Sequence, residues 1–301
     1  MLVADVGDNE HTPESLFVEA EIHKHKIDDA TIAVRVFGNG PALVFIHGYP
    51  VYGYTWRKLL PALAKEFRCY VVDLPGLGDS DWTSDTDFTF TAQARRLSKL
   101  AASLNIEKYS LIAHNTGATI ARLLTLMQPE RVKKLVIINT ELPNHRPPWI
   151  EFYQLSARLP FHQTVFRILL KNKRFVRSSM GFGQFYSDKK LFDDGKNLNP
   201  YLEPAITSSR RLNGMLNYLR GIDWDVVDKM KVEHKNIRAD VLLLWGEDDK
   251  TFPVHLGEEM ARQFSTNCRF VRISSTSLMP QEERPDKVLE HLVPFLSSSE
   301  V

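Results

Sequence analysis

The sequence predicts an α/β protein in which a doubly wound, mostly parallel sheet of eight strands is interrupted by a helical insertion. Short and nearly continuous apolar runs recur along the chain, which is typical of strands buried on both faces of a parallel sheet. Helical patterns lie between these runs, as in βαβ units. The alternation stops at residue 143 and resumes at residue 239. We therefore expect one sheet-based core with one inserted helical unit.

The first two strands are expected at an edge of the sheet. Residues 17–23 and 31–37 alternate apolar and polar side chains, which is typical of a half-buried hairpin. Apolar runs predict the next four strands, at residues 42–47 (ALVFIH), 69–73 (CYVVD), 109–113 (YSLIA) and 135–139 (LVIIN). Helical patterns occupy the segments between them, at residues 55–67, 91–104 and 117–128.

The insertion follows the sixth strand. Residues 143–223 are rich in helix formers and aromatic side chains, are broken by Pro and Gly, and contain no apolar run typical of a buried strand. The core then resumes with strands at 239–245 and 269–274, each followed by a helix, at 253–264 and 286–296. We expect a core formed by residues 1–142 and 224–301 and a helical cap formed by residues 143–223, sizes that are ordinary for domains.

Composition limits the classes of partner. The 301 residues are 43% apolar, enough for a large core, and the formal net charge is only +1. Neither nucleic acid nor an anionic membrane is indicated by so balanced a charge. One basic cluster is explained by a solvated helix face; it contains Lys171, Lys173, Arg174 and Arg177.

Location and cofactors are predicted from what the sequence lacks. Residues 1–14 are acidic and polar and do not resemble a signal peptide, and no apolar run approaches the roughly 18 residues of a membrane span. Cys69 and Cys268 form neither a disulfide framework nor a metal or redox motif. We expect a cytoplasmic protein without metal or cofactor. The sequence leaves its oligomeric state open.

A sharp turn is predicted between one strand and the next helix. Residues 113–117 (AHNTG) connect an apolar strand-like run to a helical run, which is the context of a nucleophile elbow. The residue at the tip is Asn115. A carboxamide nitrogen is not nucleophilic, and its oxygen is far weaker than a carboxylate, alkoxide or thiolate.

Three further motifs accompany the elbow in a fixed order. They follow the third, fourth and seventh predicted strands, at residues 47–50 (HGYP), 73–80 (DLPGLGDS) and 246–249 (GEDD). Together with the elbow, they resemble the α/β-hydrolase fold, and more narrowly the haloalkane dehalogenases and epoxide hydrolases. The resemblance implies a cap over the active site. Members of that family attack with an elbow aspartate, release the ester with a histidine that activates water, and orient the histidine with an acid.

The resemblance assigns two of these roles to unsuitable residues. Asn115 stands at the nucleophile position, and residues 277–283 (SLMPQEE) match the histidine segment with Leu278 at the histidine position. Asp249 fits the acid position, and Glu141 fits an alternative acid position. The backbone N–H groups of Tyr49 and Thr116 would form the oxyanion hole, the latter at a helix N-terminus.

Groups that select the substrate also depart from the family. Tyr49 and Thr116 stand where dehalogenases grip the halide, and Leu219 stands at a proton-donating tyrosine position of epoxide hydrolases. Three cap tyrosines are candidate contacts to a ligand, although aromatic residues in a cap more often serve packing. They are Tyr153, Tyr201 and Tyr218.

Because the triad is degenerate at Asn115 and Leu278, we expect hydrolysis of esters, epoxides or haloalkanes to be absent or severely impaired. The ligand is expected to be a small apolar or carbonyl-containing molecule. Among the possible functions, we expect first a non-hydrolytic chemistry of lyase, isomerase or cyclisation type. A pseudoenzyme that binds a ligand or partner and an inactivated hydrolase are the alternatives. Asp249, without a histidine, should have another donor or a pKa raised by burial.

Overall fold

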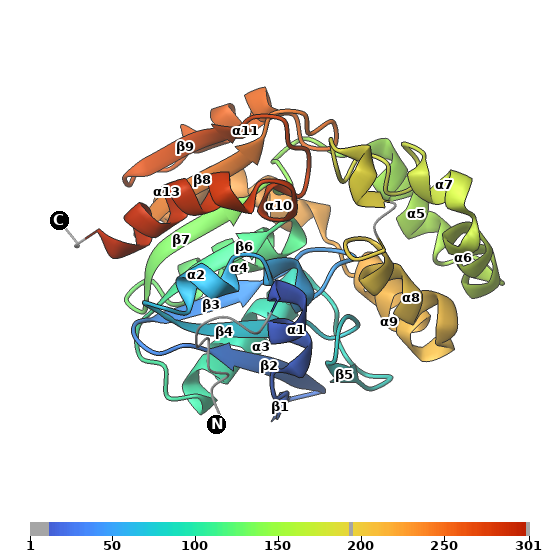
Figure 1. Ribbon diagram of the computed structural model, residues 1–301, viewed down its shortest axis with the longest axis horizontal. Helices are drawn as coiled ribbons and strands as arrows, with labels where there is room; N and C mark the ends of the chain where they lie inside the picture. The colour runs from blue at the N-terminus through green and yellow to red at the C-terminus, as the bar shows by residue number, and fades with distance from the viewer. Residues whose placement is uncertain (1–11, 193–194, 299–301) are drawn as a thin grey trace.

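A sheet with the strand order β1-β2-β4-β3-β6-β7-β8-β9 crosses the computed structural model, which describes residues 12–192 and 195–298 (Figure 1). The pairs from β4 through β3, β6, β7 and β8 to β9 are parallel, and β1, β2 and β4 pair antiparallel. The strands are β1 (His23–Ile27), β2 (Ala30–Phe37), β3 (Ala42–Ile46), β4 (Arg68–Asp73), β5 (Asp81–Trp82), β6 (Tyr109–His114), β7 (Val132–Ile138), β8 (Asp240–Gly246) and β9 (Cys268–Ile273).

The predicted α/β fold with a mostly parallel sheet is confirmed. Two strands were not predicted. β1 begins only where the strand expected at residues 17–23 ends, and β5 has two residues, pairs antiparallel with β2 and brings the sheet to nine strands. Two residues are too few to show a period in a sequence. The parallel strands β3, β6, β7 and β8 are almost wholly buried, which explains their nearly continuous apolar runs. The edge strand β9 is mostly half-buried or exposed.

Helices flank the sheet on both sides (Figure 1). α4 packs on β3, β6 and β7 and against α3, while α11 and α13 contact β8 and β9. The core helices are α1 (Pro13–Glu19), the 3₁₀ helix η1 (Gly53–Trp56), α2 (Leu60–Leu63), α3 (Phe90–Ser103), α4 (Thr116–Met127), α10 (Trp224–Glu233), the 3₁₀ helix η3 (His234–Asn236), α11 (Val254–Ala261), α12 (Pro280–Glu283) and α13 (Pro285–Ser297).

Two sequence expectations were wrong. The strand expected at residues 17–23 is instead the end of α1 and a connection to β1. Pro13 begins that helix, and the Thr12 side chain caps it by accepting from the N–H of Ser15. The helix expected at residues 55–67 is split into η1 and α2. Pro61, in the first turn of α2, has no N–H with which to continue a helix from η1.

Five α-helices and a 3₁₀ helix lie between β7 and α10 and form a separate group at the right of Figure 1. They are α5 (Pro148–Ser156), α6 (His162–Lys171), α7 (Lys173–Arg177), the 3₁₀ helix η2 (Lys189–Phe192), α8 (Asn199–Thr207) and α9 (Ser209–Arg220). We call this group the cap. The boundaries at residues 143 and 223 stay a prediction.

We expect no signal peptide in the polar N-terminal stretch. Residues 1–11, which form most of it, lie outside the described residues. Within the described ranges, no helix combines the length and the apolar character needed to cross a membrane. Cys69 and Cys268 are both free thiols.

Candidate functional site

The elbow residue Asn115 has a strained backbone. Its φ of 51° and ψ of −130° lie where residues other than glycine are rare. Neighbouring groups hold it there: its N–H donates to the carbonyl oxygens of Ile138 and Asn139, and the Thr140 hydroxyl donates to its carbonyl at 3.0 Å. The loop after β7 thus holds the turn between β6 and α4, and the Asn115 side chain is lifted out of the sheet.

Two glycines let the surrounding backbone approach this turn. A Cβ on Gly48 would lie 2.4 Å from the Cβ of Asn115, and a Cβ on Gly117 would lie 2.3 Å from the carbonyl oxygen of His47. Both distances are far shorter than any carbon contact in a packed interior. The turn therefore requires glycine at both positions for backbone packing alone.

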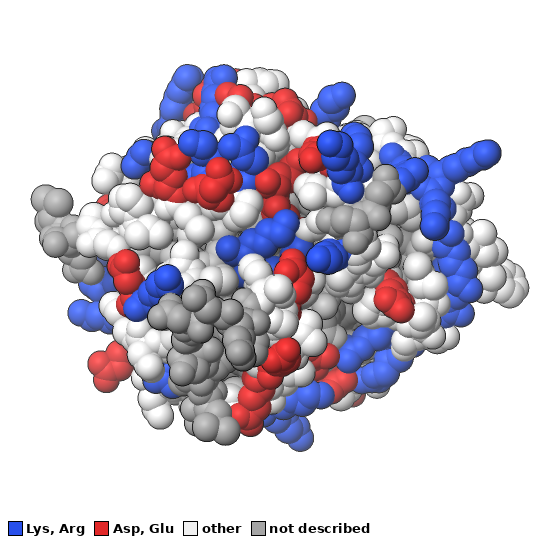
Figure 2. Space-filling model, in the orientation of Figure 1, with Lys and Arg blue, Asp and Glu red and all other residues white. Residues whose placement is uncertain are grey.

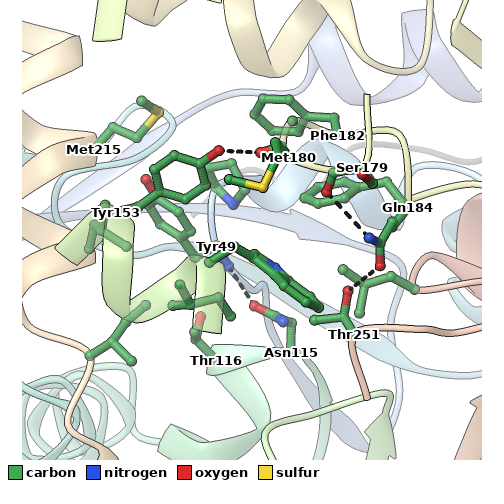
Figure 3. Close-up of a pocket in the computed structure, with 18 of the residues that line it drawn as sticks. Tyr49, Asn115, Thr116, Tyr153, Ser179, Met180, Phe182, Gln184, Met215 and Thr251 are labelled. Atoms are coloured by element: carbon green, nitrogen blue, oxygen red, sulfur yellow. Dashed lines mark hydrogen bonds between the residues drawn. The ribbon is translucent and has the colours of Figure 1, made fainter. Parts of the chain in front are cut away.

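The Asn115 amide has a defined orientation. The backbone N–H of Tyr49 donates to Oδ1 of Asn115 at 3.1 Å (Figure 3). Because that N–H can only donate, the side-chain oxygen faces Tyr49 and the NH₂ group points the other way. One of the two donors predicted for the oxyanion hole is therefore satisfied by the elbow residue itself. The other, Thr116, opens α4, and its hydroxyl is 3.0 Å from the hydroxyl of Tyr218.

Leu278 lies in the loop between β9 and α12 and lines the same cavity as Asn115. Its carbonyl oxygen accepts a hydrogen bond from Nε2 of His114 at 2.9 Å. Burial lowers the pKa of His114 to about 4, so this imidazole is neutral at pH 7. No histidine is among the described residues that line the cavity.

Three other histidines that could be considered as a base lie away from the cavity. Both ring nitrogens of His47 are engaged: Nδ1 donates to the carbonyl of Gly48, and Nε2 accepts from the N–H of Leu74. His255 is exposed on α11, and His291 lies on α13 beside Arg269. None of the three lines the cavity.

Asp249 follows β8 and is buried. Its Oδ2 accepts from Nδ2 of Asn139 at 2.6 Å, and its Oδ1 accepts from the N–H groups of Thr251 and Phe252 at 2.8 and 3.0 Å. Burial raises the pKa of Asp249 to about 7, although these donors oppose the rise. The carboxyl group thus has both of the features that we weighed for it, new donors and a raised pKa. It does not line the cavity.

Glu141, the alternative acid, is buried and does line the cavity. Its Oε2 accepts from the hydroxyls of Thr119 and Thr140 at 2.8 and 3.2 Å. Arg122, from α4, donates to the carbonyl oxygen of Glu141. Burial raises the pKa of Glu141 and lowers that of Arg122 to about 10. The sequence analysis missed Arg122, although a single arginine within the apolar run of α4 could have indicated it.

The three cap tyrosines separate in the structure. Tyr153 lines the cavity, and its hydroxyl donates to the carbonyl of Met180 (Figure 3). Tyr218 lies behind Tyr49, with ring centroids 5.7 Å apart, and does not line the cavity. Tyr201 is also outside this cavity, and its hydroxyl donates to the carboxylate of Glu282.

The cavity itself lies between the core and the cap and has a volume of about 130 Å³. Most of its lining is apolar and comes from the cap, from helices such as α5 and α6 and from the loop at residues 179–185. The polar residues on its wall are Asn115, Thr116, Glu141, Ser179, Gln184 and Thr251. Across the described residues, no cluster of His, Cys, Asp and Glu could hold a metal ion.

A second buried polar cluster connects core and cap. Nη1 of Arg57 lies 3.4 Å from Oε1 of Glu282, and the Tyr186 hydroxyl donates to Oε2 at 2.9 Å. The Tyr201 hydroxyl donates to the same carboxylate, and Arg57 also donates to the Asn197 side chain. The sequence analysis did not find this cluster, because its members are far apart in the chain.

Comparisons with known proteins agree with this architecture. Residues 41–285 match the sequence model of a family described as alpha/beta hydrolase fold. Epoxide hydrolase 4 of Homo sapiens is 27% identical over 271 residues, which cover 85% of this chain and 72% of that protein. The cis-3-alkyl-4-alkyloxetan-2-one decarboxylase of Shewanella oneidensis is 26% identical over 280 residues, which cover 87% and 84%.

Solved structures share the fold. The structure of a thermophilic esterase from Thermogutta terrifontis, with malate bound, aligns with a TM-score of 0.74 at 21% identity, covering 92% of this chain and 98% of that one. At this identity the likeness extends to the fold alone.

Proposed function

We propose that this chain, which belongs to the alpha/beta hydrolase fold family, binds a small, largely apolar molecule in its capped cavity without hydrolysing it through an ester intermediate. The observation that carries the proposal is the pairing of Asn115 and Leu278 on one cavity wall. The amide cannot attack a carbon centre, and the leucine cannot activate water to release an ester. Both chemical steps of the family's usual reaction therefore lack their reacting group.

The orientation of Asn115 supports a ligand with an oxygen that accepts a hydrogen bond. Since Oδ1 is occupied by the N–H of Tyr49, the group that Asn115 can offer to a ligand is its NH₂, a neutral donor. A carbonyl, ether or hydroxyl oxygen would satisfy it, and the apolar lining would hold the rest of the molecule. The volume of about 130 Å³ favours a small ligand.

A second candidate function, non-hydrolytic chemistry, is favoured by the position of Glu141. This carboxyl lies on the cavity wall, and burial raises its pKa, so it could exchange a proton with a bound ligand. The Shewanella oneidensis relative is named as a decarboxylase, which supports non-hydrolytic chemistry within the family. Glu141→Gln should then abolish turnover while leaving the affinity for the ligand within about fivefold, since a neutral hydrogen bond is worth only about 1 kcal/mol.

Turnover of a panel of esters, epoxides and haloalkanes tests the proposal. The chain should show no turnover above background. Asn115→Asp/Leu278→His should gain turnover by about 10³-fold or more, because triad members contribute at least that much elsewhere. The matched control, Asn115→Asp/Leu278→Gln, supplies the carboxylate but no base and should not turn over repeatedly. Hydrolysis by the unaltered chain would overturn the proposal.

Calorimetry on ligand pairs tests the binding half. A ketone or lactone should bind more tightly than the hydrocarbon of the same shape, and Asn115→Leu should remove that difference, a loss of about threefold to tenfold. The hydrocarbon should bind both proteins equally. If Asn115→Leu leaves the preference for the ketone intact, the amide is not the group that recognises the oxygen.

A further inference from the structure

The α5–α6 hairpin of the cap exposes a row of large apolar side chains. Six of them, each between 50% and 83% exposed, lie within 17 residues of one another; they are Phe152, Leu155, Leu159, Phe161, Val165 and Ile168. We call these six residues the outer cap face. Elsewhere in the described chain, exposed large apolar residues are scattered along other elements. A group of exposed large apolar side chains on one hairpin marks an interaction site more often than a bare solvent face.

The outer cap face and the cavity lie on different but adjoining sides of α6. On this helix, Phe166, Leu169 and Leu170 line the cavity, while Val165 and Ile168 point to solvent. Helical spacing places Ile168 away from Phe166 and Leu170, whereas Val165 lies beside Leu169, four residues further on, where the two surfaces meet. The hairpin is therefore apolar on two faces, and only one of them is covered in the described structure.

Phe161 adds an independent sign of function. It connects α5 to α6 with φ 60° and ψ 11°, a left-handed conformation that is costly for a bulky residue. Its side chain is 83% exposed, so packing within the described chain does not offset that cost. Local strain of this type tends to be kept at functional positions.

Charge around the outer cap face is strongly one-sided. Residues 151–180 contain six basic residues and one acidic residue, Glu151, a difference of +5, whereas the whole chain has a net charge of +1. The basic residues are Arg158, Arg167, Lys171, Lys173, Arg174 and Arg177. Figure 2 shows blue and white side chains together at the right-hand end of the molecule, where α6 and α7 lie.

We propose that the outer cap face docks on an anionic lipid surface. Apolar side chains flanked by lysine and arginine are the pattern of helices that lie in a membrane interface, with Phe and Leu among the acyl chains and the cations at the headgroups. A second copy of the chain is a poorer partner. Pairing this face with itself would bring two segments of charge +5 together, and like charges repel.

Docking in this way would bring the cavity close to the lipid. Met180 lines the cavity and is itself exposed, and α5 and α6 contribute to both surfaces. A small apolar molecule dissolved in the bilayer would then lie beside the cap. The docking itself does not depend on what the cavity does with that molecule.

Vesicle flotation of the full chain tests the proposal. We expect binding to phosphatidylcholine vesicles containing about one-third phosphatidylserine, and weaker binding to phosphatidylcholine alone. Phe161→Ser/Ile168→Ser should reduce binding by about tenfold or more, because two exposed apolar anchors are lost. The matched control, Val18→Ser/Val232→Ser, removes two exposed apolar side chains on α1 and α10 and should bind as the unaltered chain does.

A charge variant and a lipid-free measurement complete the test. Lys171→Glu/Lys173→Glu should lower binding to anionic vesicles only, and added salt should do the same to the unaltered chain. Failure to float with anionic vesicles, or equal binding by Phe161→Ser/Ile168→Ser, would overturn the proposal. Sedimentation equilibrium without lipid provides the remaining outcome. A dimer that Phe161→Ser/Ile168→Ser dissociates would assign the face to a second copy and also overturn lipid docking.

Discussion

The backbone N–H of Tyr49 donates to the side-chain oxygen of Asn115 across 3.1 Å. In an acyl-transfer enzyme, a donor at this place would stabilise negative charge that develops on the substrate or on an ester intermediate. Here it stabilises the amide of the elbow residue and fixes which end of that amide faces the cavity. The turn therefore presents an amide whose NH₂ group points away from Tyr49, and in the function proposed above this group donates to a ligand.

Asn115→Asp alone should convert the cavity into a covalent trap. The aspartate could displace halide from a haloalkane and retain the alkyl group as an ester, but Leu278 cannot activate water to release it. We expect intact-mass spectrometry to show up to one alkyl group per chain and one equivalent of halide released. Asn115→Leu, which has no carboxylate, should stay unmodified. Continued halide release beyond one equivalent would mean that another group supplies the base.

The fold was predictable because its strongest signal is local. Each buried parallel strand is a short apolar run, and these runs alternate with helical patterns, so the order of the elements could be read directly and is confirmed by the sheet and by the family match. The strand expected at residues 17–23 was wrong because four or five alternating positions fit a strand and one face of a short helix equally well. The other error was the single helix expected at residues 55–67. It arose because Pro61 breaks a helical pattern that is otherwise continuous.

The site was predictable only where a motif fixes a backbone position. The elbow, the turn after β3 and the segment before α12 brought Asn115, Tyr49 and Leu278 to one cavity; their roles stay predictions. The cap contacts were harder to predict from the sequence, because the rotation of each cap helix decides whether a tyrosine such as Tyr153 or Tyr201 faces the cavity. Arg57 and Glu282 are distant in sequence, and no local pattern indicates their contact.

Whole-chain averages hid the charge on the cap. The net charge of +1 led us to expect no attraction to anionic membranes, and the basic cluster near residue 171 was explained by solvation. Acidic residues elsewhere offset the +5 of residues 151–180, so only the position of that segment in space makes the asymmetry visible. The exposed apolar residues beside it could not be recognised from the sequence either, because helix periodicity alone does not say which of two apolar faces is covered.

The pH dependence of the free energy of unfolding should reflect the raised pKa of Asp249. The folded-state pKa of about 7 lies above the ordinary value of 3.8, so the folded chain binds more protons than the unfolded chain between those values. The free energy of unfolding should therefore fall as pH rises from about 4 to 7, by up to about 1.4 kcal/mol per pH unit, and level off above. The difference between the chain and Asp249→Asn isolates this group from other buried acids. Urea titrations at several pH values measure it. A difference that does not change with pH would show that the carboxyl keeps an ordinary pKa.

Arg57→Met should destabilise the protein by about 3–5 kcal/mol, because the Glu282 carboxylate would stay buried without the guanidinium. Glu282→Gln should cost less, because Arg57 keeps its ion pair with Glu14. Tyr186→Phe should cost less, about 1–2 kcal/mol, since it removes one hydrogen bond to Glu282. Urea unfolding of Glu282→Gln, Arg57→Met and the double variant forms a thermodynamic cycle. The double variant should lose less unfolding free energy than the two single variants lose in sum. Simple additivity would show that the two charges do not interact.

Gly48→Ala tests whether the approach of the β3 loop to Asn115 sets the ligand site. The added methyl group would lie 2.4 Å from the Cβ of Asn115 and 2.8 Å from its Oδ1, so the loop must move away and the hydrogen bond from Tyr49 must lengthen or break. We expect a loss of about 1–3 kcal/mol in unfolding free energy, which is typical of overpacking. The Asn115 amide should also lose its fixed orientation, which weakens the preference for ketones over hydrocarbons.

Gly195→Ala is the control, because only a side-chain atom 3.6 Å away faces the new methyl group there, although its φ of 68° adds backbone strain. Its stability should fall, but its preference for ketones should not. If Gly48→Ala also keeps that preference, the hydrogen bond from Tyr49 does not orient the amide.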